Sequence, residues 1–259
     1  MARKRNKAYW KDRLIEVAQK KYDLSEAAMI KEMENLYSDL AKKMRKEVEA
    51  IYLKLLEDEI KKTDIWTYKR YRDLSKRLSV LAAQIGMQEE AILNEHLESA
   101  LKSVYKASVL PNVQFHMIEE TMVKQIIATP WNGKNFSQAI WDNKALMLDQ
   151  LKKSITESAV LGRSKDKAIK DIMKRCNASY YNSARLVRTE LMHVINEGQR
   201  QRYLDGGYTT LEIIATKDER ACKICGARHG THIGINDGGM YPPFHPHCRC
   251  TIVPVLNKK

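Results

Sequence analysis

The sequence predicts a mainly α-helical protein, in which a long helical N-terminal region precedes a small α+β C-terminal domain with short strands and a knuckle rich in cysteine and histidine. Glycine is distributed unevenly, since none precedes Gly86 and eight of the eleven lie between Gly198 and Gly239. Apolar residues in the first part recur with a helical period. We therefore expect a helical, partly coiled-coil-like basic region over residues 1–130, and helices plus a compact C-terminal domain over residues 131–259.

The first long helix is predicted from Met29 to Leu56. Its apolar residues recur at spacings of three and four, close to the 3.5-residue period of a coiled coil. They are Ile30, Met33, Tyr37, Leu40, Met44, Val48, Ile51 and Leu55. A coiled-coil hairpin and a single core-facing stripe within a helix bundle both account for this pattern.

Further helical patterns span residues 68–84, 87–106 and 114–128, and the segment around Pro130 and Gly133 interrupts them. We place a joint between two regions of the chain there. Beyond the joint, helices are predicted over residues 140–162, 164–176 and 180–203.

The last predicted helix carries Arg188 beside its apolar stripe. Burying an unpaired charge is costly, so we expect Arg188 to pair with a carboxylate or with the chain that follows. Two runs rich in β-branched residues, at 209–215 and 251–255, then predict short strands. These strands bracket the segment that is densest in Cys, His, Gly and Pro.

The charge balance is basic, with 45 Lys and Arg against 32 Asp and Glu and a net charge of +13, and such a surplus attracts phosphate backbones. The longest uncharged stretch, 107–118, is too short for a membrane-spanning helix, which needs about 20 apolar residues. No apolar run of a secretory signal follows the basic N-terminus. We expect an intracellular protein with no membrane segment, whose cysteines are thiols or metal ligands rather than disulfides.

Four of the five cysteines and four of the seven histidines lie between Cys222 and Cys250. The CxxC spacing allows two thiolates to reach one ion, and a structural zinc site needs four ligands of this kind. The candidate Zn²⁺ ligands are Cys222, Cys225, His245, Cys248 and Cys250, with His247 as a competing donor. Four free thiols in a small packed subdomain are the alternative.

Catalysis by the metal is not expected, because the segment lacks the HxE and HExxH patterns of zinc hydrolases. Glu190, His193 and Glu197 share one helical face and resemble a ligand set, but a solvated helical face explains them as well. We therefore expect a protein that is not an enzyme.

Three charged residues flank the candidate ligands. Asp218 and Arg220, just before the CxxC, are expected to pair with each other or to support the knuckle through hydrogen bonds. Arg249, between two candidate ligands, is expected to contact Glu190 or a phosphate. The more ordinary interpretation is that all three form structural ion pairs.

A basic segment near residues 61–77 is a candidate surface for non-specific DNA binding. Its cations are Lys61, Lys62, Lys69 and Arg70, interleaved with Trp66, Tyr68 and Tyr71. Lysines can follow phosphates while aromatic rings stack on bases. An ordinary solvated helical face is the alternative.

Residues 185–255 resemble the C-terminal domain of the phage head morphogenesis family, the minor head proteins named after the F protein of phage Mu. The matching features are RTE at 188–190, Asn196, a strand, DERACKIC at 218–225, Gly230, and PPFHPHCRC at 242–250. The motif residues carried over are Arg188, Glu190, Asn196, Asp218, Arg220 and Arg249. Matching the family favours His245 over His247 as the imidazole ligand.

This resemblance implies a minor structural protein of a tailed bacteriophage virion, made in the host bacterial cytoplasm and taken into the head interior. Its implied partners are the portal, scaffold or major capsid protein of the same phage, together with DNA, in head assembly and in DNA packaging or delivery. Two alternatives remain: a metal-dependent enzyme that acts on nucleic acid, and a zinc-containing regulator that binds nucleic acid.

Overall fold

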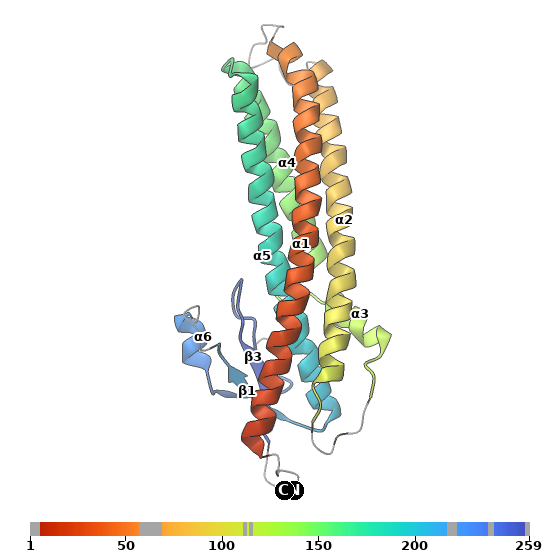
Figure 1. The fold of residues 1–259 in the computed structure, drawn as a ribbon, viewed down its shortest axis with the longest axis vertical. Helices are drawn as coiled ribbons and strands as arrows, with labels where there is room; N and C mark the ends of the chain where they lie inside the picture. The colour runs from red at the N-terminus through yellow and green to blue at the C-terminus, as the bar shows by residue number, and fades with distance from the viewer. Residues whose placement is uncertain are drawn as a thin grey trace. The chain divides into compact units, whose positions relative to one another are not determined.

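The computed structural model describes residues 6–56, 69–110, 113, 116–216, 222–237 and 241–256. Six helices and three strands lie within these ranges (Figure 1). The helices are α1 Lys7–Leu56, α2 Lys69–Ala107, α3 Glu120–Ala128, α4 Phe136–Val160, α5 Lys165–Asp205 and α6 Lys223–Arg228. The strands are β1 Thr210–Ile214, β2 His232–Gly234 and β3 Thr251–Pro254. The predicted class, mainly helical with a small α+β part near the C-terminus, is confirmed.

The chain forms two compact units, each assembled from segments distant in sequence. The bundle unit contains Ile30–Ile92 and Phe136–Ala184, and the sheet unit contains Met1–Met29, Leu93–Asn135 and Arg185–Lys259. Helices α1, α2 and α5 contribute residues to both units. The sequence division between residues 130 and 131 stays a prediction.

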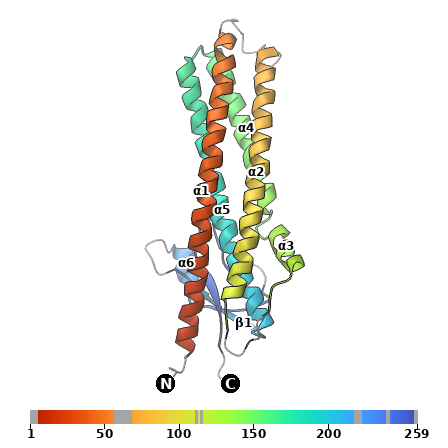
Figure 2. The ribbon, with the colours of Figure 1, turned by 45° about the vertical axis from the view of Figure 1, so that its right-hand side comes forward.

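Four helical segments, from α1, α2, α4 and α5, make up the bundle unit and run alternately in opposite directions along the chain (Figure 2). Each presents an apolar stripe to the interior, as expected for a helix bundle. The stripe of α1 includes Met33, Tyr37, Leu40, Met44 and Val48, all buried. Within this unit, the apolar stripe of α1 therefore faces the core of a helix bundle, which is one of the two arrangements that the sequence pattern allowed.

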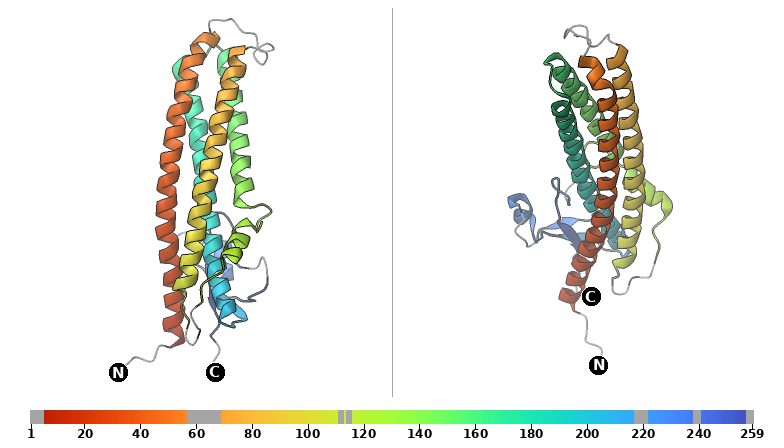
Figure 3. Two further views of the ribbon diagram at one scale, coloured as in Figure 1. Left: turned by 90° about the vertical axis from the view of Figure 1, so that its right-hand side faces the viewer. Right: turned by 45° about the horizontal axis from the view of Figure 1, so that its top comes forward.

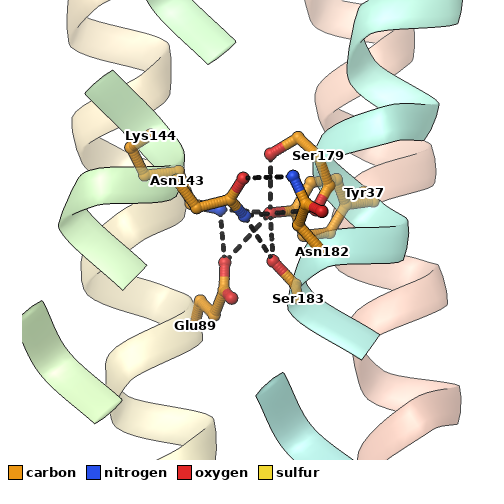
Figure 4. Close-up of polar contacts among 7 residues, drawn as sticks. All are labelled: Tyr37, Glu89, Asn143, Lys144, Ser179, Asn182 and Ser183. Carbon is orange, nitrogen blue, oxygen red and sulfur yellow. Dashed lines mark hydrogen bonds and ion pairs between the residues drawn. The ribbon is translucent and has the colours of Figure 1, made fainter. Parts of the chain in front are cut away.

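A layer of polar side chains crosses the interior of the bundle unit, with contributions from all four helical segments (Figure 4). Lys144 lies 2.5 Å from Glu89, and the Tyr37 hydroxyl lies 3.0 Å from the same carboxylate. Hydrogen bonds then connect Tyr37 to Ser183, at 2.7 Å, and to Ser179, at 3.2 Å. Buried polar groups of this kind are stable only when they are paired.

The sheet unit holds an antiparallel sheet with the strand order β2-β1-β3. The strands are drawn in shades of blue in the right-hand view of Figure 3. Strand β1 pairs with β3 from Leu211 opposite Pro254 to Ile214 opposite Thr251. Residues of β1 and β3 belong to a cluster of buried apolar residues. The cluster contains Leu14, Leu110, Tyr203, Leu211, Ile214, Ile235, Ile252 and Val253. Both predicted strands are therefore present and paired, and β2 is an additional strand that sequence patterns did not predict.

The helices are longer than predicted. Helix α1 begins at Lys7 instead of Met29, α2 continues through Gly86, and α5 replaces two separate predicted helices. Helix α3, by contrast, begins at Glu120, six residues later than predicted. No helix among the described residues is long and apolar enough to cross a membrane.

Candidate metal centre

The first two candidate ligands lie at the start of α6. Cys222 is the residue that precedes the helix, and its Sγ accepts a hydrogen bond from the backbone N–H of Cys225, at 3.4 Å. This N-terminal capping interaction holds both sulfur atoms on the same side of a tight turn. The CxxC therefore forms a short knuckle, and α6 is its continuation.

The other three candidates lie on the loop that leads into β3. A hydrogen bond of 3.1 Å from the Cys248 N–H to the His245 carbonyl closes a tight turn in this loop. Within the turn His247 has a positive φ of 62°, which directs the chain sharply around. His245 and Cys248 are consequently close together, although His247 itself is exposed.

Donor atoms from the knuckle and the loop meet in two overlapping groups. Cys222, Cys225 and His245 form one group, and Cys225, Cys248 and Cys250 form the other, with all donor atoms in a group within 4.8 Å of each other. The Nε2 atom of His245 lies 3.2 Å from Cys222 Sγ and 3.0 Å from Cys225 Sγ. Cys225 belongs to both groups and lies 3.7 Å from Cys248 Sγ.

The three donors within each group are close enough to bind one metal ion, and the two groups share only Cys225. Tetrahedral coordination with zinc–ligand bonds of roughly 2.0–2.3 Å places neighbouring donor atoms about 3.5–3.8 Å apart. The spacing of Cys225 and Cys248 agrees with that value, and the two sulfur–imidazole distances are slightly shorter. All five predicted donors are present in the two groups, and His247 belongs to neither. The residues are therefore close enough to hold a metal.

The pKa values of the four thiols shift in opposite directions, and burial raises that of Cys225 to about 12. A hydrogen bond with Cys250 lowers the pKa of the Cys248 thiol to about 5, and the same interaction raises the pKa of Cys250. Hydrogen bonding to the Cys225 backbone lowers the pKa of Cys222 as well. Thiolates are the form of cysteine that binds metals, so Cys222 and Cys248 lose their protons more readily than the other two thiols.

Apolar packing covers the inner side of the cluster. Cys225, Cys248 and Cys250 are buried together with Ala215, which follows β1, and Phe244 packs against them. All five cysteines of the chain are free thiols. This part of the structure lacks a large apolar core of its own, as expected for a module that a metal stabilises.

Arg188 and Arg249 form ion pairs with α1. Arg188 Nε lies 2.6 Å from Glu26, and Arg249 lies 2.6 Å from Asp23. Arg188 therefore pairs with a carboxylate, as expected. The Arg249 guanidinium pairs with Asp23 and lies over the Tyr22 ring, so its partner is Asp23 and not Glu190.

Glu190 and His193 are buried, so the interpretation of their helical face as solvated was wrong. Trp131 covers them: its indole N–H donates to Glu190 Oε2 at 3.0 Å, and its ring stacks on His193 with centroids 4.6 Å apart. Burial raises the pKa of Glu190 to about 7 and lowers the pKa of His193 to about 4. Neither residue joins a metal-binding group within the described ranges.

Several predicted residues lie outside the described ranges. Asp218 and Arg220 of the motif are among them, as are Lys61 and Lys62 of the basic segment. Lys69 is exposed at the start of α2. Arg70 follows it in the same helix, and its side chain is not described. Tyr71 is buried, so the expectation that its ring stacks on bases was wrong. The interpretation of the cations of this segment as a DNA-binding surface stays a prediction.

Sequence reasoning did not identify two residues that lie close to the candidate ligands or the motif. Gln199 bonds through both ends of its amide, donating to the Leu14 carbonyl and accepting from the Thr251 hydroxyl. Trp131 lies in the glycine-containing segment that was interpreted only as a joint. Gln199 is a polar residue three positions after Asn196 and therefore lies on the same helical face, and this spacing was the signal that could have identified it.

Comparisons with known proteins identify one region of the chain. A family model described as "Phage Mu protein F like protein" matches residues 149–253, which contain the whole Cys/His cluster. No curated protein and no solved structure matches the chain.

Proposed function

We propose that this chain, whose residues 149–253 match the phage Mu F-like family, is a phage head morphogenesis protein and a minor structural protein of a tailed bacteriophage head. The family match over residues 149–253 is the observation that carries this proposal. In this proposal the protein is made in the host bacterial cytoplasm and lies in the interior of the head. Its partners are the portal, scaffold or major capsid protein of the same phage.

The proposed role is structural and not catalytic. The Cys/His cluster supports it, because its three buried cysteines, packed with Ala215 and Phe244, resemble a closed structural metal site. A catalytic zinc keeps one coordination position open to water and has a general base nearby. The buried carboxylate of Glu190 lies instead against Trp131, which donates to it.

We further propose that the ion is Zn²⁺ and that four of the five donors hold it. The ion would join the α6 knuckle to the loop that precedes β3. In this role zinc supplies folding free energy, since binding stabilises only the folded arrangement of the ligands.

Non-specific DNA binding, in packaging or delivery of the genome, completes the proposal. The net charge of +13 supports it, because cationic surfaces bind phosphate backbones without reading sequence. The surface we propose is the basic segment that includes Lys69 and Arg70.

The head assignment is tested on particles. Procapsids and mature heads are purified from cells that produce the phage encoding this chain, and mass spectrometry measures the chain relative to the major capsid protein. We expect a few copies per head, and fewer DNA-filled heads when the gene is deleted. Absence of the chain from both kinds of particle would exclude a structural role in the head.

The metal assignment is tested by elemental analysis of the purified protein. We expect one zinc per chain in the parent and none in the Cys222→Ser, Cys250→Ser double variant. Cys176→Ser is the matched control, because Cys176 is buried in the bundle unit beside Met44, at 3.5 Å, and is not part of the cluster. A well-folded parent that takes up no zinc would show that packing and hydrogen bonds alone hold the cluster.

A further inference from the structure

Buried polar side chains of α5 form hydrogen bonds with the chain just before and just after the loop that carries the candidate metal ligands. Asn196, Gln199 and Tyr203 lie at spacings of three and four, on one face of the helix. All three are fully buried. Their hydrogen bonds reach residues that flank the cluster, which connects α5 to the candidate metal centre within the sheet unit.

Asn196 makes the most informative of these contacts. Its side-chain Nδ2 donates to the Pro242 carbonyl at 3.2 Å and to the Cys250 carbonyl at 3.1 Å. These two carbonyls stand at the beginning and at the end of the loop that carries His245 and Cys248. Only the amide nitrogen can satisfy two carbonyl acceptors, because the amide oxygen has no hydrogen to donate. One side chain therefore fixes both ends of the ligand loop.

The next two positions hold the strand that follows the loop. Gln199 accepts from Thr251 at 2.7 Å, and the Tyr203 hydroxyl donates to the Ile252 carbonyl at 3.3 Å. Three consecutive residues, 250, 251 and 252, are thus hydrogen-bonded to side chains on one face of α5. The contact with Cys250 involves a candidate ligand directly, whereas the contact of Tyr203 lies two residues beyond it.

We propose that Asn196 is a positioning residue for metal binding: it closes the 242–250 loop on α5 and so arranges His245, Cys248 and Cys250 before the ion arrives. This proposal rests on the proposed metal centre. Hydrogen bonds behind metal ligands orient them, and their loss typically lowers metal affinity about 10–100-fold. A preassembled loop also loses less conformational entropy when it binds.

The test compares zinc affinity in the full-length parent, Asn196→Leu and Tyr203→Phe, by competition with a chromophoric chelator. Asn196→Leu keeps the branching at Cγ and removes both hydrogen bonds, and Tyr203→Phe removes one hydrogen bond of the same helical face away from the ligands. We expect zinc affinity to fall at least tenfold in Asn196→Leu and to stay at the parental value in Tyr203→Phe. Equal affinity in all three proteins, or an equal loss in both variants, would overturn the positioning role.

A second measurement needs no metal. In metal-stripped protein, iodoacetamide should modify Cys248 and Cys250 faster in Asn196→Leu than in the parent or in Tyr203→Phe, because both thiols are buried in the closed loop. Unchanged rates would contradict the proposal. If the parent itself binds no zinc, the proposed metal centre fails and these rates alone decide whether Asn196 closes the loop.

Asn196→Asp provides a second variant in case the leucine disturbs folding. It keeps the size and polarity of the side chain but presents acceptors to two carbonyls, so the same loss of affinity and the same faster modification are expected. Circular dichroism monitors the helices in each variant. Loss of the whole fold in both Asn196 variants would also overturn the proposal, because a positioning residue acts on the loop alone.

Discussion

Lys144 and Glu89 form an ion pair in the interior of the bundle unit, with Nζ 2.5 Å from Oε2 and side chains that are 3% and 0% exposed. Burial lowers the pKa of Lys144, and the nearby carboxylate of Glu89 opposes that shift. The lysine also bonds to the Tyr37 hydroxyl, so both charges belong to the polar layer that crosses the bundle. Each charge therefore depends on the other to remain buried.

Removal of one charge from this pair is expected to be far more costly than removal of both. Lys144→Met should lower the free energy of unfolding by about 3–5 kcal/mol, because the Glu89 carboxylate stays buried without its cation. The double variant with Glu89→Leu should recover most of that loss, since no unpaired charge remains. Urea unfolding of the parent, both single variants and the double variant measures the coupling. Single variants that lose less than about 1 kcal/mol would show that water reaches the charges.

Gly86 is expected to resist substitution, although alanine favours a helix by about 1 kcal/mol over glycine. A Cβ at residue 86 would lie 2.9 Å from the Trp141 ring, whose indole N–H is fixed by a hydrogen bond to Glu90 at 3.2 Å. Gly86→Ala should therefore destabilise the protein by roughly 1–3 kcal/mol. The control is Gly226→Ala in α6, where a Cβ would meet nothing within 4 Å. Urea unfolding that ranks the two substitutions equally would contradict this explanation.

Glu190 is expected to make stability fall as pH rises from about 4.5 to about 7. Its pKa increases from 4.5 to about 7 on folding because the carboxyl is buried, so the folded state retains the proton longer than the unfolded state. Glu190 does not lower the free energy of unfolding below about pH 4.5. Between pH 4.5 and 7 its effect grows until the free energy of unfolding is lower by about 3 kcal/mol. Glu190→Gln keeps an acceptor for the Trp131 indole and removes the charge.

The variant should therefore gain stability over the parent at pH 8 and match it near pH 4. Urea unfolding of both proteins from pH 4 to 8.5 measures the difference. His193 has the opposite pH dependence, because its pKa falls on folding, but its contribution cancels in the comparison if the two residues titrate independently. A difference that stays constant with pH would mean that folding does not raise the pKa of Glu190.

DNA affinity is expected to depend on the basic segment in a salt-sensitive way. Replacing Lys61, Lys62, Lys69 and Arg70 by glutamate should weaken binding and flatten the dependence of log affinity on log salt, by about one unit of slope for each phosphate that the protein no longer neutralises. The matched control reverses four exposed lysines elsewhere, namely Lys31, Lys43, Lys46 and Lys174. Fluorescence anisotropy over a range of salt concentrations measures both slopes. Equal salt slopes in the two variants would show that DNA binding depends on the net charge of the protein and not on the basic segment.

Local patterns predicted much of the architecture. The stripe from Ile30 to Val48, the strand at 209–215 and the cluster between Cys222 and Cys250 each depend on residues close together in sequence, whose period or ligand spacing is visible directly. The helix boundaries were less accurate, because propensity alone favoured a break near Gly86. The close approach of Trp141 accounts for a glycine in the middle of α2. Strand β2, with three residues, is too short to produce a periodic signal.

The sequence by itself determined that this protein is mostly helical, basic and equipped with a set of Cys and His donors at metal-binding spacing. Only the tertiary structure decided which groups meet: Arg249 pairs with Asp23 across 226 residues of sequence, and Glu190 is buried beneath Trp131. The same holds for Asn196, which joins the two ends of the ligand loop. Helical period and ligand spacing are properties of near neighbours, whereas burial and pairing depend on the path of the whole chain.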